Sequence, residues 1–337
     1  MNVFIDNITI AISNGIGLFK PLYWLFGYVM KFLLDIFNDQ YFLALVVFTI
    51  LTRLVMFPLN LKQQKTMAKT SRIQPKIQKI QNKYKVNEIT DPVERQKASQ
   101  KMQEEMQDLY IREGHNPMNM GCGPMIFQMV FLMGIIGIIY YPLEYILGIP
   151  LSANTGVIEE IFQELGSNKV AYYQLEILQN FDVYREALVA KLPDLFTPEA
   201  IANIETYRNS LRIGSLTMTQ FPHWKDGAII IFPLLSLATS LGSSVISTLI
   251  QKKNNPAMAQ QSAQMWMMML MMPLFSFYIS FQVPAAVSFY WVISNLVAIL
   301  QQVFMAKFYS PKKNQAYHMI ESTIERRSRE ESLKKIK

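Results

Sequence analysis

Arg53 is a cation within an apolar run, and this combination determines which chemistry the sequence could perform. The run FLALVVFTILTRLVMFP covers residues 42–58 and is long enough to span a lipid bilayer as a helix. A charged side chain inside a membrane is costly, so it commonly faces a polar cavity or the path of a substrate. We therefore expect Arg53 to attract anionic groups electrostatically. Snorkelling toward the membrane surface is the alternative, because Pro58 follows five residues later.

Polar side chains in other apolar runs could form a wet space around this arginine. The run 227–250 has hydroxyls at helical spacing (Ser236, Ser240, Ser243 and Ser247), with Thr239 and Ser244 beside them. Small polar residues of this kind can also serve close helix packing alone. Gln128 lies in the run 124–147, and Tyr290 and Asn295 lie in the run 284–305. Burying these amides and this phenol in lipid without hydrogen-bond partners would be costly. The candidate groove residues are therefore Arg53, Gln128, Ser240, Ser243, Ser244, Tyr290 and Asn295.

The sequence contains no motif of an enzyme. It lacks a glycine-rich phosphate loop, a cluster of metal ligands and a nucleophile beside a base. Its only cysteine, Cys122, excludes a disulfide within the chain. We therefore expect no catalytic residues, no metal and no cofactor.

Five apolar runs predict the helices that must position the candidate residues. Of the 337 residues 51% are hydrophobic and only 17% are charged, against about 25% charged in a soluble protein. The fold class predicted is an all-α integral membrane protein. The expected transmembrane helices are residues 41–58, 124–147, 227–250, 264–281 and 284–305.

The distribution of Lys and Arg predicts the orientation of the chain, because these residues stay on the cytoplasmic side. Residues 58–123, 251–263 and 306–337 together carry a net charge of +12. Residues 1–41 and 148–226, with Glu144, carry −6. We therefore expect a multi-pass protein with its N-terminus outside and its C-terminus in the cytoplasm.

The segments outside the spans have expected structures of their own. Residues 1–40 should hold an external helix that lies along the membrane surface, since Trp24, Tyr28 and Lys31 occur among its apolar residues. Residues 148–226 should form an external helical insert, with Thr197 as an N-cap and Pro198 at the first helical position.

The cytoplasmic segments are basic. Residues 59–123 should form a helical hairpin whose second helix has Asp91 as N-cap and Pro92 at its first position. The basic surface of this hairpin could bind anionic lipid, RNA or acidic segments of other proteins. Residues 251–263 should be a short loop. The basic tail, residues 306–337, could be a retention anchor or an arm that binds ribosomal RNA.

An ordered set of motifs resembles the YidC/Oxa/Alb family of membrane protein insertases. The motifs are TRLVMFPLNLKQQKTM, IQPKIQKIQNKYK, MQDLYIREGHNPMNMGCGPMIFQM and MMPLFSFYISFQVPAAVSFYWVISNLVAILQQ. They cover most of residues 20–150 and 227–306. The sequence departs from the family in two places. Ser243 stands where the third span commonly has a glutamine, and the insert 148–226 is longer than the family leads us to expect.

The resemblance implies five helices around a hydrophilic groove, with Arg53 inside it and Tyr290, Trp291 and Asn295 as the pattern of the fifth span. It implies an insertase and membrane chaperone of the bacterial plasma membrane, which moves hydrophobic segments of nascent proteins from cytoplasm to lipid. The implied partners are nascent membrane proteins, the bilayer, the ribosome and the Sec translocon. The resemblance implies that the protein acts either alone or together with the Sec translocon. No nucleotide, metal or cofactor is implied.

Two other functions stay open at this point. Arg53 could hold a small anionic solute in a channel or secondary transporter. The absence of internal repeats and of other charged residues within the spans is against this function. The chain could also be a scaffolding partner without insertion activity.

Overall fold

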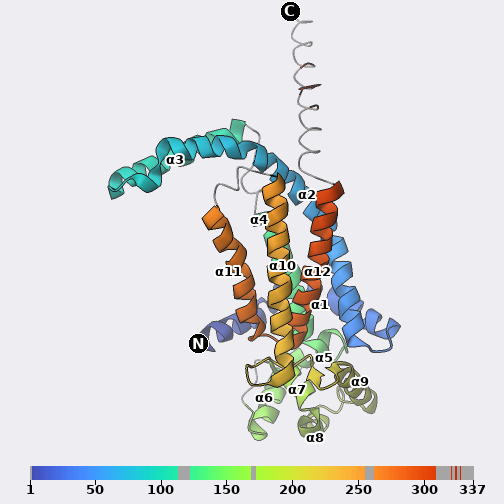
Figure 1. Cartoon of the computed structure of the whole chain (residues 1–337). Helices are drawn as coiled ribbons and strands as arrows, with labels where there is room; N and C mark the ends of the chain where they lie inside the picture. The colour runs from blue at the N-terminus through green and yellow to red at the C-terminus, as the bar shows by residue number, and fades with distance from the viewer. Residues whose placement is uncertain are drawn as a thin grey trace, which may run out of the picture. The chain divides into compact units, whose positions relative to one another are not determined.

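The computed structural model describes the backbone of residues 2–112, 122–167, 172–254 and 262–308, together with Ile320, Thr323, Ile324 and Arg327. The chain divides into two compact units, and each is described by itself. The first unit comprises residues 1–54, 128–242 and 271–297, and the second comprises residues 55–127, 243–270 and 298–337. Figure 1 labels the α-helices along the chain.

The described residues are mostly helical, as expected of an all-α membrane protein. The helices up to the start of the insert 148–226 are α1 (Asn2–Ile36), α2 (Tyr41–Tyr84), η1 (Val86–Glu88), α3 (Pro92–Arg112), α4 (Cys122–Tyr140) and α5 (Pro142–Tyr145). The insert holds η3 (Leu151–Asn154), α6 (Thr155–Glu164), α7 (Tyr173–Gln179), α8 (Phe181–Lys191), α9 (Pro198–Ser210), β1 (Arg212–Ile213) and β2 (Leu216–Thr217). The remaining helices are η5 (Gly227–Ile230), α10 (Ile231–Asn254), α11 (Ser262–Ser280) and α12 (Ala285–Phe308).

Three helices within the described residues are long and apolar enough to cross a membrane. They are Tyr41–Gln63, Gly227–Ile250 and Ala285–Phe308. They coincide with the first, third and fifth expected spans. Two shorter apolar helices, Gln128–Tyr140 and Met269–Ser280, lie at the second and fourth. The structure thus supports a helical membrane protein with three candidate spans, and five spans remain a prediction.

Two helix ends lie away from the expected span boundaries. α2 does not end at Pro58 but continues to Tyr84, with Pro75 also inside it. A proline fixes a helical φ and removes only one backbone donor, so a helix with stabilising contacts on both sides of it can continue. Helix α4 ends at Tyr140, and the rest of the expected second span folds into the short helix α5, which is buried.

Helix α1 packs closely on two neighbours in the first unit. Its buried face over residues 23–34 consists of Tyr23, Phe26, Met30, Leu33 and Leu34, a pattern of helical periodicity. A Cβ added at Gly137 of α4 would lie 2.3 Å from the Tyr23 ring. A Cβ added at Gly27 would lie 2.0 Å from the carbonyl oxygen of Tyr145 in α5. These two glycines therefore allow the helix backbones to approach closely.

The insert, residues 148–226, is mainly helical and contributes Phe162, Phe181, Leu188 and Ile204, all fully buried, to the apolar core of the first unit. The expected N-cap of α9 is confirmed, because the Thr197 hydroxyl accepts a hydrogen bond of 3.2 Å from the backbone N–H of Ala200. The strands β1 and β2 were not predicted. They pair antiparallel around Gly214, whose φ of 61° lies in the left-handed region.

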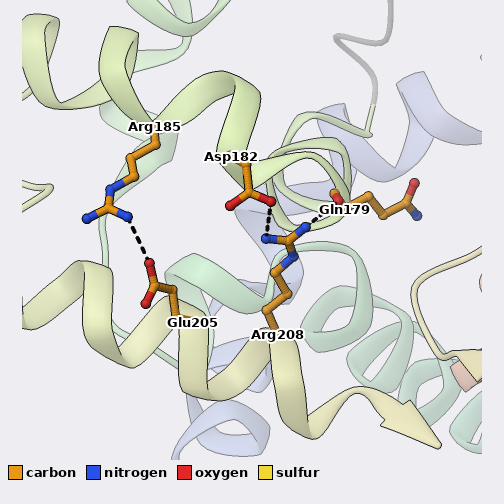
Figure 2. A network of polar contacts seen from close by, with 5 residues as sticks. All are labelled: Gln179, Asp182, Arg185, Glu205 and Arg208. Carbon is orange, nitrogen blue, oxygen red and sulfur yellow. Dashed lines mark hydrogen bonds and ion pairs between the residues drawn. The ribbon is translucent and has the colours of Figure 1, made fainter. Parts of the chain in front are cut away.

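Ion pairs join the helices of the insert at its surface (Figure 2). Arg208 of α9 donates from Nη1 to the Asp182 carboxylate of α8 at 2.8 Å and from Nη2 to the Gln179 carbonyl of α7 at 3.1 Å. Arg185 of α8 donates to the Glu205 carboxylate of α9 at 3.0 Å. These bonds fix α9 against the helices that precede it.

The segment of the second unit that was expected to form the hairpin agrees with the local expectations. Ile73, Ile77 and Ile80 form a buried stripe on α2. The Asp91 carboxylate accepts a hydrogen bond of 3.0 Å from the backbone N–H of Val93, which confirms this N-cap. Helix α3 has no buried residues and is joined to α2 by an ion pair of 2.8 Å between Lys83 and Glu105.

Some expectations fall outside the described residues. These are the middle of the loop 251–263, most of the tail 306–337 and the side chain of Cys122.

Candidate functional site

The guanidinium of Arg53 is hydrogen-bonded to the hydroxyl of Ser294. Nε of Arg53 donates to Oγ of Ser294 at 2.9 Å, and Nη2 donates to the same oxygen. Arg53 lies on α2 and is partly buried, whereas Ser294 lies on α12 and is only 3% exposed. A hydroxyl is neutral, so this partner orients the guanidinium without cancelling its charge.

The sequence of α2 explains why Arg53 lies on the protein-facing side of the helix. Thr49 and Thr52, one turn and one residue before it, are buried and bond their hydroxyls to backbone carbonyls of their own helix at 2.7 and 2.8 Å. Leu54 and Val55 are 57% and 66% exposed. Leu54 and Val55 lie on an exposed side of α2 that suits contact with lipid. Arg53 lies next to the buried Thr52, at the edge of the side of α2 that faces the protein.

The partner of Arg53 lies in the interior of α12. Ser294 follows the first residue of the helix by nine positions and precedes the last by fourteen. At a rise of about 1.5 Å per residue, Ser294 is about 13.5 Å along the helix axis from the nearer helix end. A snorkelling arginine would extend toward a helix end, so the geometry favours a guanidinium held inside the protein.

Two predicted groove residues lie in the same region of the first unit. Tyr290 is buried on α12, one turn before Ser294. The amide of Asn295 donates a long hydrogen bond of 3.4 Å to the Thr239 hydroxyl of α10. The Thr239 hydroxyl in turn donates to the Leu235 carbonyl at 2.8 Å. The structure therefore joins α12 to α2 through Ser294 and to α10 through Asn295.

For the other predicted groove residues the structure gives their burial and their helix. Ser240 is partly buried on α10, and Trp291 is partly buried and packs against the apolar core of the first unit. Gln128 is exposed on α4. Ser243 and Ser244 are partly buried and belong to the second unit, so their contribution to a groove with Arg53 remains a prediction.

Ser294 is the functional candidate that sequence reasoning missed. It follows Tyr290 by four residues, so helical periodicity alone puts the two on one face of α12. The signal was therefore present, but Ser is common at helix packing surfaces and nothing in the sequence ties this one to Arg53. Thr239 was noted beside the hydroxyl stripe and was not chosen.

The described residues offer no site for a metal ion, since they hold no group of three His, Cys, Asp or Glu side chains that could act as ligands. The described part of the chain instead pairs the Arg53 cation with the Ser294 hydroxyl in a polar cluster, and the same helix α12 carries Tyr290 and Asn295. Such a cluster can attract and hydrogen-bond an anionic group.

Comparison with known proteins identifies a family. The family model described as 60Kd inner membrane protein matches residues 32–313. The chain is 25% identical over 295 residues to the membrane protein insertase YidC 2 of Listeria innocua, with 88% of this chain and 72% of that protein covered. It is 26% identical over 294 residues to the membrane protein insertase YidC of Oceanobacillus iheyensis, with 87% and 83% covered.

A third relative is much longer. The chain is 24% identical over 282 residues to the membrane protein insertase YidC of Treponema denticola. The matched region covers 83% of this chain but only 37% of that protein. These matches confirm the resemblance to the insertase family that the motifs indicated.

Proposed function

Since the chain belongs to the 60Kd inner membrane protein family, we propose that it is a membrane protein insertase and membrane chaperone that moves hydrophobic segments of nascent proteins from the cytoplasm into the lipid bilayer. The family consists of non-enzymatic insertases, in agreement with the expectation that the chain is not an enzyme. Its family and its apolar helices make it a bacterial inner membrane protein.

The observation that carries the mechanism is the bond between Arg53 and Ser294. A nascent segment with a short acidic tail enters a hydrophilic groove, and the positive charge of Arg53 attracts the carboxylates of the tail. Opposite charges about 4 Å apart attract by about 4 kcal/mol at an effective dielectric constant of about 20, and by about 1 kcal/mol in bulk water. A partly buried guanidinium therefore attracts the tail more strongly than an arginine at the surface would.

Ser294 has a positioning role in this mechanism. Because two donors of Arg53 converge on its hydroxyl, the guanidinium keeps one orientation while the tail enters. Burial of the client's apolar segment in lipid then supplies the free energy that completes insertion.

The remaining parts of the proposal follow the family. Five helices span the membrane, with the N-terminus outside and the C-terminus in the cytoplasm, and the helical hairpin of residues 59–123 receives the client. Gln128, Ser240, Ser243, Ser244, Tyr290, Trp291 and Asn295 line the groove with Arg53. The ribosome and the Sec translocon are proposed partners, and the protein also acts alone.

The test is insertion of an acidic-tailed client into vesicles that contain the full chain. We expect Arg53→Ala to slow insertion by roughly tenfold, the effect of losing about 1.4 kcal/mol of attraction. Arg53→Lys should keep part of the activity, because it keeps the charge but not the fork of donors. Arg212→Ala, which removes an exposed arginine of the external insert, is the matched control.

Two outcomes would contradict the proposal. Unchanged insertion by Arg53→Ala would remove Arg53 from the mechanism. Uptake of a small anion by the same vesicles, without client insertion, would instead indicate a channel or transporter.

A further inference from the structure

A pocket of about 260 Å³ lies between α1 and the segment that begins with α5, in the first unit and away from Arg53. Its walls combine aromatic rings with two opposite charges, and its principal lining residues are Trp24, Tyr28, Lys31, Phe32, Asp35 and Tyr145. The volume is slightly below the range of about 300–1,000 Å³ that is typical of sites for drug-sized ligands. It therefore suits a small polar group better than a whole lipid molecule.

The wall of this pocket is held in place by close packing. The backbone of α1 at Gly27 approaches the Tyr145 carbonyl so closely that no Cβ fits between them. Tyr145 is buried, and its ring contacts the Trp24 ring edge to face, with centroids 5.6 Å apart and an interplanar angle of 86°. The indole is therefore oriented by the protein although it is 53% exposed.

The two charges of the pocket are separated by one helical turn. Lys31 and Asp35 are both exposed on α1, four residues apart and on the same side of the helix. Neither makes an ion pair with another residue in the part of the chain that the structure describes. An ammonium group and a carboxylate thus face one small space with their hydrogen-bonding capacity available.

The side chains around the pocket suit contact with lipid. Tyr28, Phe32 and Ile36 of α1 are 74%, 57% and 54% exposed, and together they form an apolar surface beside the two charges. Large exposed aromatic residues next to a Lys are typical of helices at the level of the lipid headgroups.

From this arrangement we propose that the pocket binds the headgroup of a zwitterionic phospholipid, with its phosphate at Lys31 and its ammonium group at Asp35. The rings of Trp24, Tyr28 and Tyr145 add cation–π attraction for the ammonium group. The acyl chains lie along the exposed apolar residues of α1. An anionic headgroup fits less well, because it would place a second negative charge beside Asp35 without compensation.

This inference goes beyond client insertion, and it concerns the outer side of the protein in the proposed orientation. A bound lipid would tie α1 to the membrane surface at one defined position. Loss of lipid binding and loss of insertion are separate measurements, so failure of one is distinguishable from failure of the other.

The experiment is native mass spectrometry of the full chain in detergent, titrated with phosphatidylethanolamine, phosphatidylcholine or phosphatidylglycerol of identical acyl chains. We expect a one-to-one phosphatidylethanolamine complex at a concentration at least threefold below that needed for phosphatidylglycerol. Phosphatidylcholine that binds as tightly as phosphatidylethanolamine would also support the inference, because both carry a phosphate and an ammonium group.

Matched variants locate the site. Lys31→Gln and Asp35→Asn should each weaken phosphatidylethanolamine binding at least threefold. Lys20→Gln, on α1 outside the pocket, and Asp39→Asn, in the turn after α1, make the same charge changes and should leave binding unchanged. Circular dichroism of each variant checks that the helices are intact.

Three results would overturn the inference. They are phosphatidylglycerol binding as tight as phosphatidylethanolamine binding, equal losses in the control variants, and displacement of the lipid by an equal concentration of soluble phosphoethanolamine. The last result would show that the site takes a free metabolite rather than a membrane lipid.

Discussion

Arg53 and Ser294 are 241 residues apart in the sequence and are joined by a hydrogen bond of 2.9 Å from the guanidinium Nε to the serine Oγ. This bond links the first candidate span to the last within one compact unit. The bond holds the guanidinium of Arg53 near the middle of the length of α12. Substitution of Ser294 therefore tests whether the orientation of Arg53 matters for insertion.

We expect Ser294→Ala to slow insertion of an acidic-tailed client by roughly three- to tenfold. A hydrogen bond to a charged group contributes about 1.5–3 kcal/mol, and water in the proposed groove would replace part of this. Ser294→Thr keeps the hydroxyl and should retain most of the rate. Ser288→Ala is the control, because Ser288 is buried on the same helix but donates to the Ser280 carbonyl. Equal rates for Ser294→Ala and the control would exclude the positioning role.

Gly27→Ala should destabilise the first unit. The new methyl group would lie 2.0 Å from a backbone carbonyl oxygen, which cannot move as a side chain can. Overpacking of this kind costs about 1–3 kcal/mol. Gly156→Ala on α6, where a Cβ meets nothing within 4 Å, should instead stabilise the chain by about 0.5–1 kcal/mol. Unfolding midpoints in detergent should therefore shift in opposite directions, and a common direction would contradict this account of α1 packing.

Arg208→Ala should lower the unfolding midpoint more than Arg185→Ala does. Arg208 is 19% exposed and bonds both a carboxylate and a backbone carbonyl, whereas Arg185 is 49% exposed and bonds one carboxylate. Exposed ion pairs contribute little, and a partly buried arginine with two partners contributes more. Thermal unfolding of the two variants in the same detergent measures the difference. A larger effect of Arg185→Ala would show that burial does not determine how much each arginine contributes to stability.

Acid should weaken the contact between α8 and α9. The hydrogen bond and positive charge of Arg208 lower the pKa of Asp182 from its ordinary value. A carboxyl whose folded pKa is depressed stabilises the protein above its unfolded pKa of about 3.9, and this contribution disappears as the pH falls through the folded pKa. The unfolding midpoints of the unmodified chain and Asp182→Asn should therefore differ at pH 6 and converge below about pH 4. A constant difference would be evidence against this linkage.

Glu105→Lys should separate α3 from the end of α2, because it places two cations where Lys83 and Glu105 now form an ion pair of 2.8 Å. Spin labels on Asn82→Cys and Gln103→Cys, with Cys122→Ser, would report a longer and broader distance distribution. Glu104→Lys adds the same charge at the neighbouring exposed position and should leave the distribution unchanged. Because the pair is exposed, high salt should reproduce part of the effect.

Local chemistry in the sequence was sufficient to predict several features of the helices. The N-caps at Asp91 and Thr197 were predicted correctly, since capping depends on residues within three positions of each other. The hairpin strands around Gly214 were missed, although glycine in a two-residue connection is a known signal for them. The sequence did not show that one helix, α2, runs from the first expected span into the expected hairpin through Pro58 and Pro75, because contacts on both sides of a proline can outweigh its local cost.

The sequence by itself determined the membrane class, the helical content, the family and the candidate cation, because hydropathy, periodicity and motif order are properties of neighbouring residues. Only the tertiary structure decided that Ser294 is the partner of Arg53, and that Gly27 and Tyr145 bring α1 against α5 to form a pocket. Periodicity tells which side chains share a helix face, but the rotation and depth of each helix result from the sum of its packing contacts. A partner 241 residues away is therefore set by packing, and no local pattern specifies it.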